Sequence, residues 1–117
     1  MAINFQDKNL GCRYSIPTAI SWFFSSTNLD VCVILEDDCL PSNEFFETIN
    51  EYQYEINSGN MGILSGTFPV VGFTNREIIR TKYSFIHGWS VGRITWSKLR
   101  KQLYTSNLQK VNISLAE

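Results

Sequence analysis

The sequence VCVILEDDCLP, at residues 31–41, decides how this chain is organised. Its first five residues are apolar and rich in β-branched side chains, and three consecutive acids, Glu36, Asp37 and Asp38, follow directly. An apolar run closed by charges and a proline predicts a strand that is buried on both faces and whose C-terminal end reaches solvent. In an open α/β sheet, ligands bind in the crevice beyond the carboxyl ends of the strands, so the acids are candidates for a binding site.

Three adjacent carboxylates repel one another unless a cation or several hydrogen-bond donors compensate their charge. Mg²⁺ or Mn²⁺ carrying the phosphates of a nucleotide suits oxygen ligands of this kind. An acidic turn after a buried strand is the simpler interpretation of the same residues. Response-regulator receivers also carry an acidic pair after an apolar strand. They need a further Asp after a later strand, however, and no Asp follows Asp38.

Length and composition predict a single folded domain. The chain has 117 residues, which is enough for one hydrophobic core. Its hydrophobic content of 44% and aromatic content of 14% argue against disorder. A formal net charge of −1 predicts no general affinity for nucleic acid or an anionic membrane. The cysteines, Cys12, Cys32 and Cys39, show no paired metal-ligand spacing and favour a reduced, cytoplasmic location. The sequence indicates neither a signal peptide nor a membrane span of ~20 apolar residues.

Helical spacing of apolar residues predicts two helices on either side of the apolar stretch. The first is expected over about residues 15–26, because Pro17 fits best in the first turn of a helix, and an earlier start with a kink at Pro17 is the alternative. The second is expected after Pro41, where Ser42 or Asn43 can cap it.

The second half of the chain has shorter elements. Glycines bracket an expected buried strand at residues 61–66, and residues 82–86 are a further candidate strand. Residues 67–81 between them are expected to be irregular, because proline, glycine and asparagine interrupt them. A helix is expected after Arg93, and residues 104–117 form a weakly patterned tail.

Three blocks of the sequence resemble one family of proteins. They are NLGC (9–12) with ISWFF (20–24), ILEDDCLP (34–41) with Phe45 and Phe46, and Gly88-Trp89 ahead of Trp96. In this order they resemble nucleotide-diphospho-sugar glycosyltransferases of the GT-A fold, most of all the bacterial family-2-type sugar transferases and more distantly the N-acetylglucosaminyltransferase I type. The resemblance spans about residues 9–103. It implies an α/β fold: a partial, Rossmann-like GT-A sheet in three layers with flanking helices.

The same resemblance assigns the acids a role. Glu36, Asp37 and Asp38 match the metal-binding acidic triplet of the family, often called DXD. The resemblance implies that Asp38 binds Mn²⁺ or Mg²⁺, with Glu36 at the metal or its water shell and Asp37 in contact with the nucleotide-sugar. Such a cation bridges two phosphates of the donor and neutralises charge as the sugar leaves.

His87, Gly88 and Trp89 match the glycine-tryptophan loop that lies beside the acceptor pocket in the family. The resemblance implies that Gly88 allows a close backbone approach and that Trp89 offers an aromatic face to a sugar ring. A packing role for His87, which is the single histidine, is the simpler interpretation.

Two further residues are candidates for the reaction. Arg93 can pair with a diphosphate, because a guanidinium matches two phosphate oxygens, although a surface salt bridge is an equal alternative. An inverting transferase needs a general base. Glu77 is the one acid after the triplet that lies outside both the helix expected after Pro41 and the end of the chain. Family domains begin with a strand and two βα units that hold the nucleotide base, and only eight residues precede the first matched block here.

Two hypotheses follow. In the first, the chain is the metal-binding and acceptor-side part of a glycosyltransferase that transfers a hexosyl or N-acetylhexosaminyl group from a nucleotide-diphospho-sugar to a sugar acceptor, and it needs further segments for catalysis. In the second, it is a non-catalytic α/β remnant that binds a ligand or acts as an oligomeric interaction module. Because a sheet without its first strands exposes an edge, both hypotheses predict a homo-oligomer, most simply a dimer.

Overall fold

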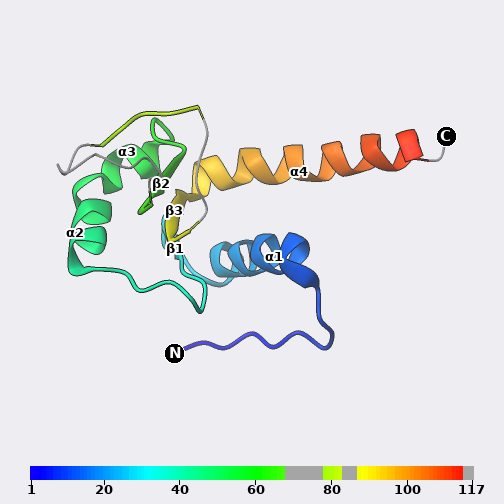
Figure 1. The fold of residues 1–117 in the computed structure, drawn as a ribbon, viewed down its shortest axis with the longest axis horizontal. Coiled ribbons are helices and arrows are strands. Elements are labelled where there is room, and N and C mark those ends of the chain that lie inside the picture. The colour runs from blue at the N-terminus through cyan, green and yellow to red at the C-terminus, as the bar shows by residue number, and fades with distance from the viewer. Residues whose placement is uncertain (68–77, 83–86, 115–117) are drawn as a thin grey trace.

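The computed structural model describes residues 1–67, 78–82 and 87–114, with side chains described up to residue 103. Its helices and strands follow one another along the chain (Figure 1) as α1 (Gly11–Ser26), β1 (Val31–Ile34), α2 (Asn43–Glu51), α3 (Gln53–Ser58), β2 (Ile63–Ser65), β3 (Trp89–Gly92) and α4 (Arg93–Ser114). The α/β class expected from the sequence is therefore confirmed, while the finer GT-A assignment stays a prediction.

The described strands form one sheet in the order β1-β3-β2. Strand β3 is antiparallel to both neighbours, with Val31 opposite Gly92 in one ladder and Ile63 opposite Val91 in the other. Strands β1 and β2 consequently run in the same direction. Their C-terminal ends lie at the same edge of the sheet, where β3 begins.

The expectation that residues 31–35 form a strand buried on both faces is wrong. Strand β1 is at the side of the described sheet, and Val33 is 37% exposed. The strand that is buried along its whole length is β3, because it lies between the other two. The sequence did not predict β3 as a strand. The candidate strand at residues 82–86 lies largely outside the described residues.

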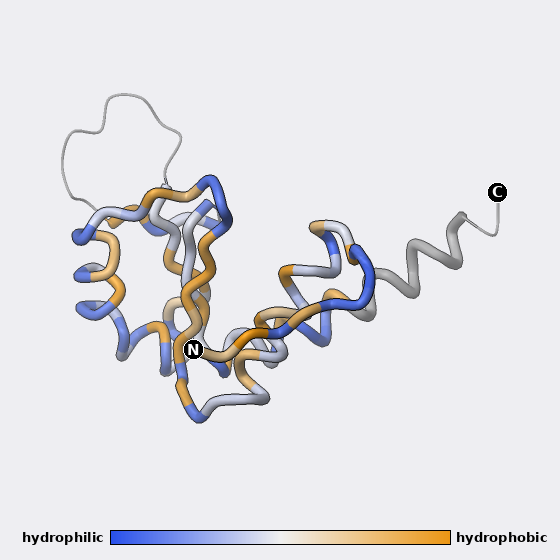
Figure 2. The backbone as a smooth tube through the Cα atoms, turned by 90° about the horizontal axis from the view of Figure 1, so that it is seen from below, coloured by the Kyte–Doolittle hydropathy of each residue, from blue (hydrophilic) through white to orange (hydrophobic). Residues whose placement is uncertain are grey.

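Helices cover both faces of the sheet, which gives three layers (Figure 1). Against α1 lies a core made of Ile20, Phe24, Cys32, Trp89, Val91 and Trp96. Against α2 and α3 lies a second core made of Ile49, Ile56 and Leu64. Figure 2 shows the strands between them as largely hydrophobic segments, while the helix α2 alternates between hydrophobic and hydrophilic residues.

Helix α3 packs very closely on the sheet at Gly92. A Cβ atom added to Gly92 would collide with the backbone carbonyl of Ile56, so only glycine allows this approach. On the opposite face of β3, Trp89 and Val91 point into the core beneath α1. Side chains that alternate between the two faces of one strand thus connect both layers of helices.

Two helices differ in extent from their predicted bounds. Helix α1 begins at Gly11, where the side chain of Asn9 accepts a hydrogen bond from the Gly11 N–H at 2.8 Å. Pro17 consequently lies inside the helix rather than in its first turn. Of the two candidate caps, Ser42 and Asn43, the structure has Ser42, whose hydroxyl accepts from the N–H of Phe45. The helix after it is divided at Tyr52 into α2 and α3. Among the described residues, no helix is long and apolar enough to cross a membrane.

Candidate functional site

Three segments that are distant in sequence meet at the edge of the sheet where β1 and β2 end. They are the acidic turn after β1, residues 66–67 after β2, and residues 87–88 before β3. Two hydrogen bonds fasten the last two segments together: the N–H of Gly66 donates to the carbonyl of Gly88 at 2.8 Å, and the hydroxyl of Thr67 donates to the carbonyl of His87 at 3.0 Å. The backbone of His87 is therefore held over the end of the sheet.

The acids that follow β1 lie in a tight turn. The N–H of Cys39 donates to the carbonyl of Glu36 at 3.1 Å and closes the turn around Asp37 and Asp38. Asp37 and Asp38 are exposed, and Glu36 is half-buried. The predicted placement of these acids at the solvent-reaching end of the strand is confirmed.

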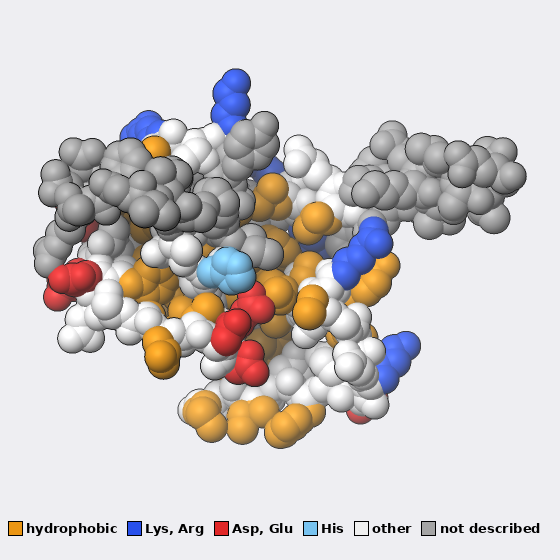
Figure 3. Space-filling model, in the orientation of Figure 1, with side chains coloured by type: hydrophobic (Ala, Val, Ile, Leu, Met, Phe, Trp, Pro, Cys, Tyr) orange, Lys and Arg blue, Asp and Glu red, His pale blue; other side chains and the backbone are white. Residues whose placement is uncertain are grey.

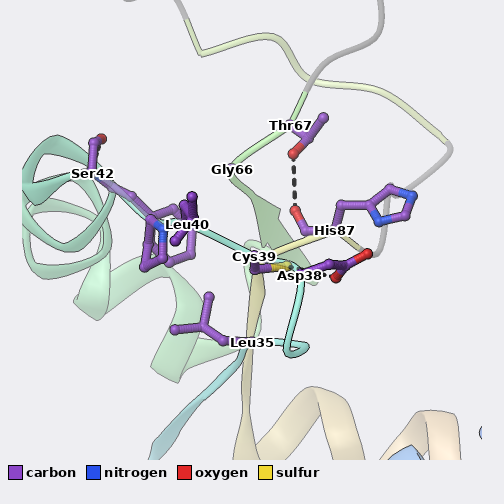
Figure 4. A pocket seen from close by; sticks show the side chains of 11 residues that line it. Leu35, Asp38, Cys39, Leu40, Ser42, Gly66, Thr67 and His87 are labelled. Atoms are coloured by element: carbon purple, nitrogen blue, oxygen red, sulfur yellow. Dashed lines mark hydrogen bonds between the residues drawn. The ribbon is translucent and has the colours of Figure 1, made fainter.

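A cavity of about 350 Å³ opens beside this turn. Its walls come from all three segments and from the start of α2, and they comprise Leu35, Asp38, Cys39, Leu40, Pro41, Ser42, Phe45, Gly66, Thr67, His87 and Gly88. In Figure 4 the side chains of Asp38 and His87 lie next to each other on one side, while Leu40 and Ser42 lie on the other. Figure 3 shows acidic side chains directly beside the single histidine on this face of the molecule. The cavity therefore joins a polar wall to an apolar one.

The triplet is not a preformed metal site by itself. In the part of the chain that the structure describes, no three His, Cys, Asp or Glu side chains converge on one point. Glu36, Asp37 and Asp38 therefore do not converge on one ion in the arrangement described. A hard cation such as Mg²⁺ commonly uses one or two carboxylates together with waters and substrate phosphates. This arrangement fits Asp38 beside an open cavity.

The structure places Arg93 at the opposite end of β3 from the acidic turn. Its guanidinium donates hydrogen bonds to the carbonyls of Phe24, Thr27 and Leu29, at 2.6, 2.8 and 2.6 Å. It also stacks over the ring of Phe24 and lies 3.7 Å from a carboxylate oxygen of Asp30. Arg93 thus fixes the end of α1 and is not brought to the acids, so the structure does not support its expected contact with a diphosphate.

The acceptor loop expected at residues 87–89 is only partly in the cavity. His87 and Gly88 line it, but the side chain of Trp89 is 6% exposed and lies in the core under α1. The indole N–H of Trp89 has no hydrogen-bond partner among the described residues. The ring is therefore not available to stack on a sugar in this arrangement. Glu77, the expected general base, lies outside the described residues.

Gly66 and Thr67 belong to the site, and sequence reasoning missed them. A Cβ atom at Gly66 would come within 2.7 Å of the ring of Phe45, so a glycine lets α2 approach the end of β2. The signal was a glycine directly after a short apolar strand, which is a position where the backbone can approach a ligand or another chain segment.

The cysteines near the site differ in character. Cys39 lines the cavity, with its thiol 3.9 Å from a carboxylate oxygen of Asp38. Cys32 lies in the core, where burial raises the pKa of its thiol to about 11. Because the thiolate is the reactive form, Cys32 is poorly suited to nucleophilic or ligand chemistry.

No protein-family model, curated protein or solved structure matches this chain.

Proposed function

We propose that this chain binds a divalent cation, Mn²⁺ or Mg²⁺, together with a nucleotide-diphospho-sugar at the cavity beside the acidic turn. The observation that carries the proposal is the meeting of Asp38, Thr67 and His87 at one edge of the sheet. A carboxylate, a hydroxyl and an imidazole around one opening can supply an oxygen ligand for a cation and hydrogen bonds for a sugar.

Each wall of the cavity has a role in the proposal. Asp38 holds the cation, and the diphosphate of the donor supplies further oxygen ligands, which explains how a single exposed carboxylate is sufficient on the protein side. Glu36 and Asp37 contact the water shell of the cation or the ribose. His87 and Gly88 lie where a hydroxyl group of the acceptor would approach. Trp89 and Arg93 take no part, because the core and the end of α1 occupy them.

In this proposal the chain belongs to the sugar-transferring class, and the transferred group is hexosyl or N-acetylhexosaminyl. The cation would neutralise the charge that develops on the diphosphate as the glycosidic bond breaks. The acceptor hydroxyl would lose its proton to a general base, and Glu77 remains the candidate for that role.

Calorimetry on the full chain tests the binding step. UDP-, GDP- and dTDP-sugars are titrated with and without Mn²⁺, and we expect binding of one of them to require the cation. Asp38→Asn should weaken that binding by at least about tenfold, which corresponds to the loss of about 1.4 kcal/mol. Glu47→Gln removes an equal charge from the exposed face of α2 and should leave the affinity unchanged.

Two results would overturn the proposal. One is that no nucleotide-sugar binds in a cation-dependent way, and the other is that Asp38→Asn and the control bind equally well. Either result favours the non-catalytic remnant, whose ligand or partner would be recognised elsewhere on the chain.

A further inference from the structure

Residues 1–6, with the sequence MAINFQ, have the pattern of a strand but lie apart from the sheet. The larger apolar side chains stand at every second position, with Ala2, Asn4 and Gln6 between them, so that Met1, Ile3 and Phe5 share one side of an extended chain. Figure 1 shows the segment separated from the strands, and Figure 2 shows its first residues as hydrophobic, with hydrophilic positions only after them. Ile3 is 60% exposed and Phe5 is 86% exposed. We call residues 1–6 the N-terminal arm.

Within residues 1–67, 78–82 and 87–114, one edge of strand β1 is unpaired. The N–H of Arg93 donates to the carbonyl of Asp30 at 2.8 Å, so Asp30 and Arg93 are a hydrogen-bonded pair of the antiparallel ladder between β1 and β3. In such a ladder, every second pair of opposite residues is hydrogen-bonded. The peptide groups of Cys32 and Ile34 therefore point toward β3, and those of Val31 and Val33 point away from it. Among the described residues, these outward peptide groups make one hydrogen bond, a long one of 3.9 Å in which the thiol of Cys32 donates to the carbonyl of Val33. Backbone donors and acceptors on such an edge are a template for another strand.

The arm and the edge match in spacing. Val31, Val33 and Leu35 alternate along the edge just as Met1, Ile3 and Phe5 alternate along the arm. Val33 and Leu35 are 37% and 41% exposed, so the apolar side chains at this edge are only partly covered. With Ile3 opposite Val33, all three apolar pairs form whether the added strand is parallel or antiparallel. A shift by one residue would place Asn4 against Val33 and leave the small Ala2 as the one apolar side chain of the arm opposite the edge.

We propose that the arm of a second copy of this chain adds to the edge of β1, and that the exchange is reciprocal, so that the chain forms a symmetric dimer. As far as the described residues show, the exchange joins a segment without a backbone partner to a strand edge without one. Main-chain hydrogen bonds supply the attachment, and the alternating side chains supply the register. Because each copy gives an arm and receives one, the contact closes on itself and does not continue into a filament. The proposal does not depend on nucleotide-sugar binding.

Sedimentation analysis of the full chain over a range of concentrations tests the association. We expect a dimer for the unaltered sequence and a monomer for the double variant Ile3→Asp, Phe5→Asp. The matched control, Asn4→Asp with Gln6→Glu, adds the same two charges on the other side of the arm and should remain a dimer. Because residues 1–6 are exposed, circular dichroism should report the same fold for all three proteins. A monomeric unaltered chain, or a dimer that survives the double variant, would overturn the proposal.

Disulfide trapping tests the register. Chains that carry Ile3→Cys are mixed with chains that carry Val33→Cys, both in a background of Cys12→Ser and Cys39→Ser, so that a bond between the introduced cysteines joins two molecules. We expect this pair to cross-link faster than the control pair, in which Asn4→Cys replaces Ile3→Cys, because residue 4 faces the other way. Equal rates for the two pairs would refute pairing in this register, and with it the proposed exchange.

Discussion

Replacing Arg93 should destabilise the fold more than any other single change of a charged residue in its neighbourhood. The guanidinium donates to three backbone carbonyls that close the end of α1 and the turn leading to β1. Hydrogen bonds from a charged donor contribute about 1.5–3 kcal/mol each, but neighbouring bonds are not additive. The side chain is 36% exposed, so water replaces part of what is lost. We therefore expect Arg93→Ala to lower the free energy of unfolding by about 2–4 kcal/mol.

Urea denaturation followed by tryptophan fluorescence measures this loss. Arg93→Lys keeps the charge but cannot reach all three carbonyls with one ammonium group, so it should recover about half of the loss. Lys98→Ala removes a charge from an exposed position of the same helix and should change the stability by less than about 0.5 kcal/mol. If Arg93→Ala costs no more than Lys98→Ala, the carbonyl contacts do not hold the end of α1, and a ligand-binding role for Arg93 would have to be reconsidered.

Two further predictions concern the core. Gly92→Ala should destabilise the chain by about 2 kcal/mol or more, because the new methyl group meets the carbonyl of Ile56. At the exposed Gly62 a new methyl group makes only an ordinary contact of 3.9 Å with the Thr95 side chain, so Gly62→Ala is the control, and thermal unfolding compares the two. The pKa of Cys32 is raised from 9.0 to about 11, so the unfolded chain loses this proton first and stability should fall as pH rises between these values. Cys32→Val should flatten that fall in denaturation curves measured across this pH range; an unchanged slope would assign the fall to other groups.

The sequence was informative where structure is decided locally. Ser42 was predicted as a helix cap because its hydroxyl reaches an N–H only three residues away. The acids were placed at a strand end because an apolar run stops directly before them. The acids lie close to His87 because β3 is inserted between β1 and β2, and no local sequence pattern encodes that order of strands.

The failures have physical causes that can be traced to single residues. Residues 89–92 were not predicted as a strand because Ser90 and Gly92 interrupt the apolar pattern. In the structure, Gly92 is needed for the close approach of Ile56, and the Ser90 hydroxyl reaches the carbonyl of Leu64 at 3.5 Å. For Arg93, a contact with a diphosphate and a surface salt bridge were equal alternatives, and the structure has an ion pair with Asp30. Its carbonyl partners were not predicted, because they lie more than 60 residues earlier in the chain. Strand β1 was expected to be central, since an apolar run alone does not distinguish a middle strand from a strand at the side.

Of the three described strands, β3 joins the other two and is also the last to be synthesised. Strands β1 and β2 each pair with β3 and not with each other, and the partner of Val31 is Gly92. When only residues up to 88 have left the ribosome, neither the β1–β3 pair nor the β2–β3 pair can form, even if the helices have formed. Cotranslational folding of the described sheet must therefore wait until residues 89–92 have emerged, and until then the apolar edges of β1 and β2 are open to chaperones or to aggregation.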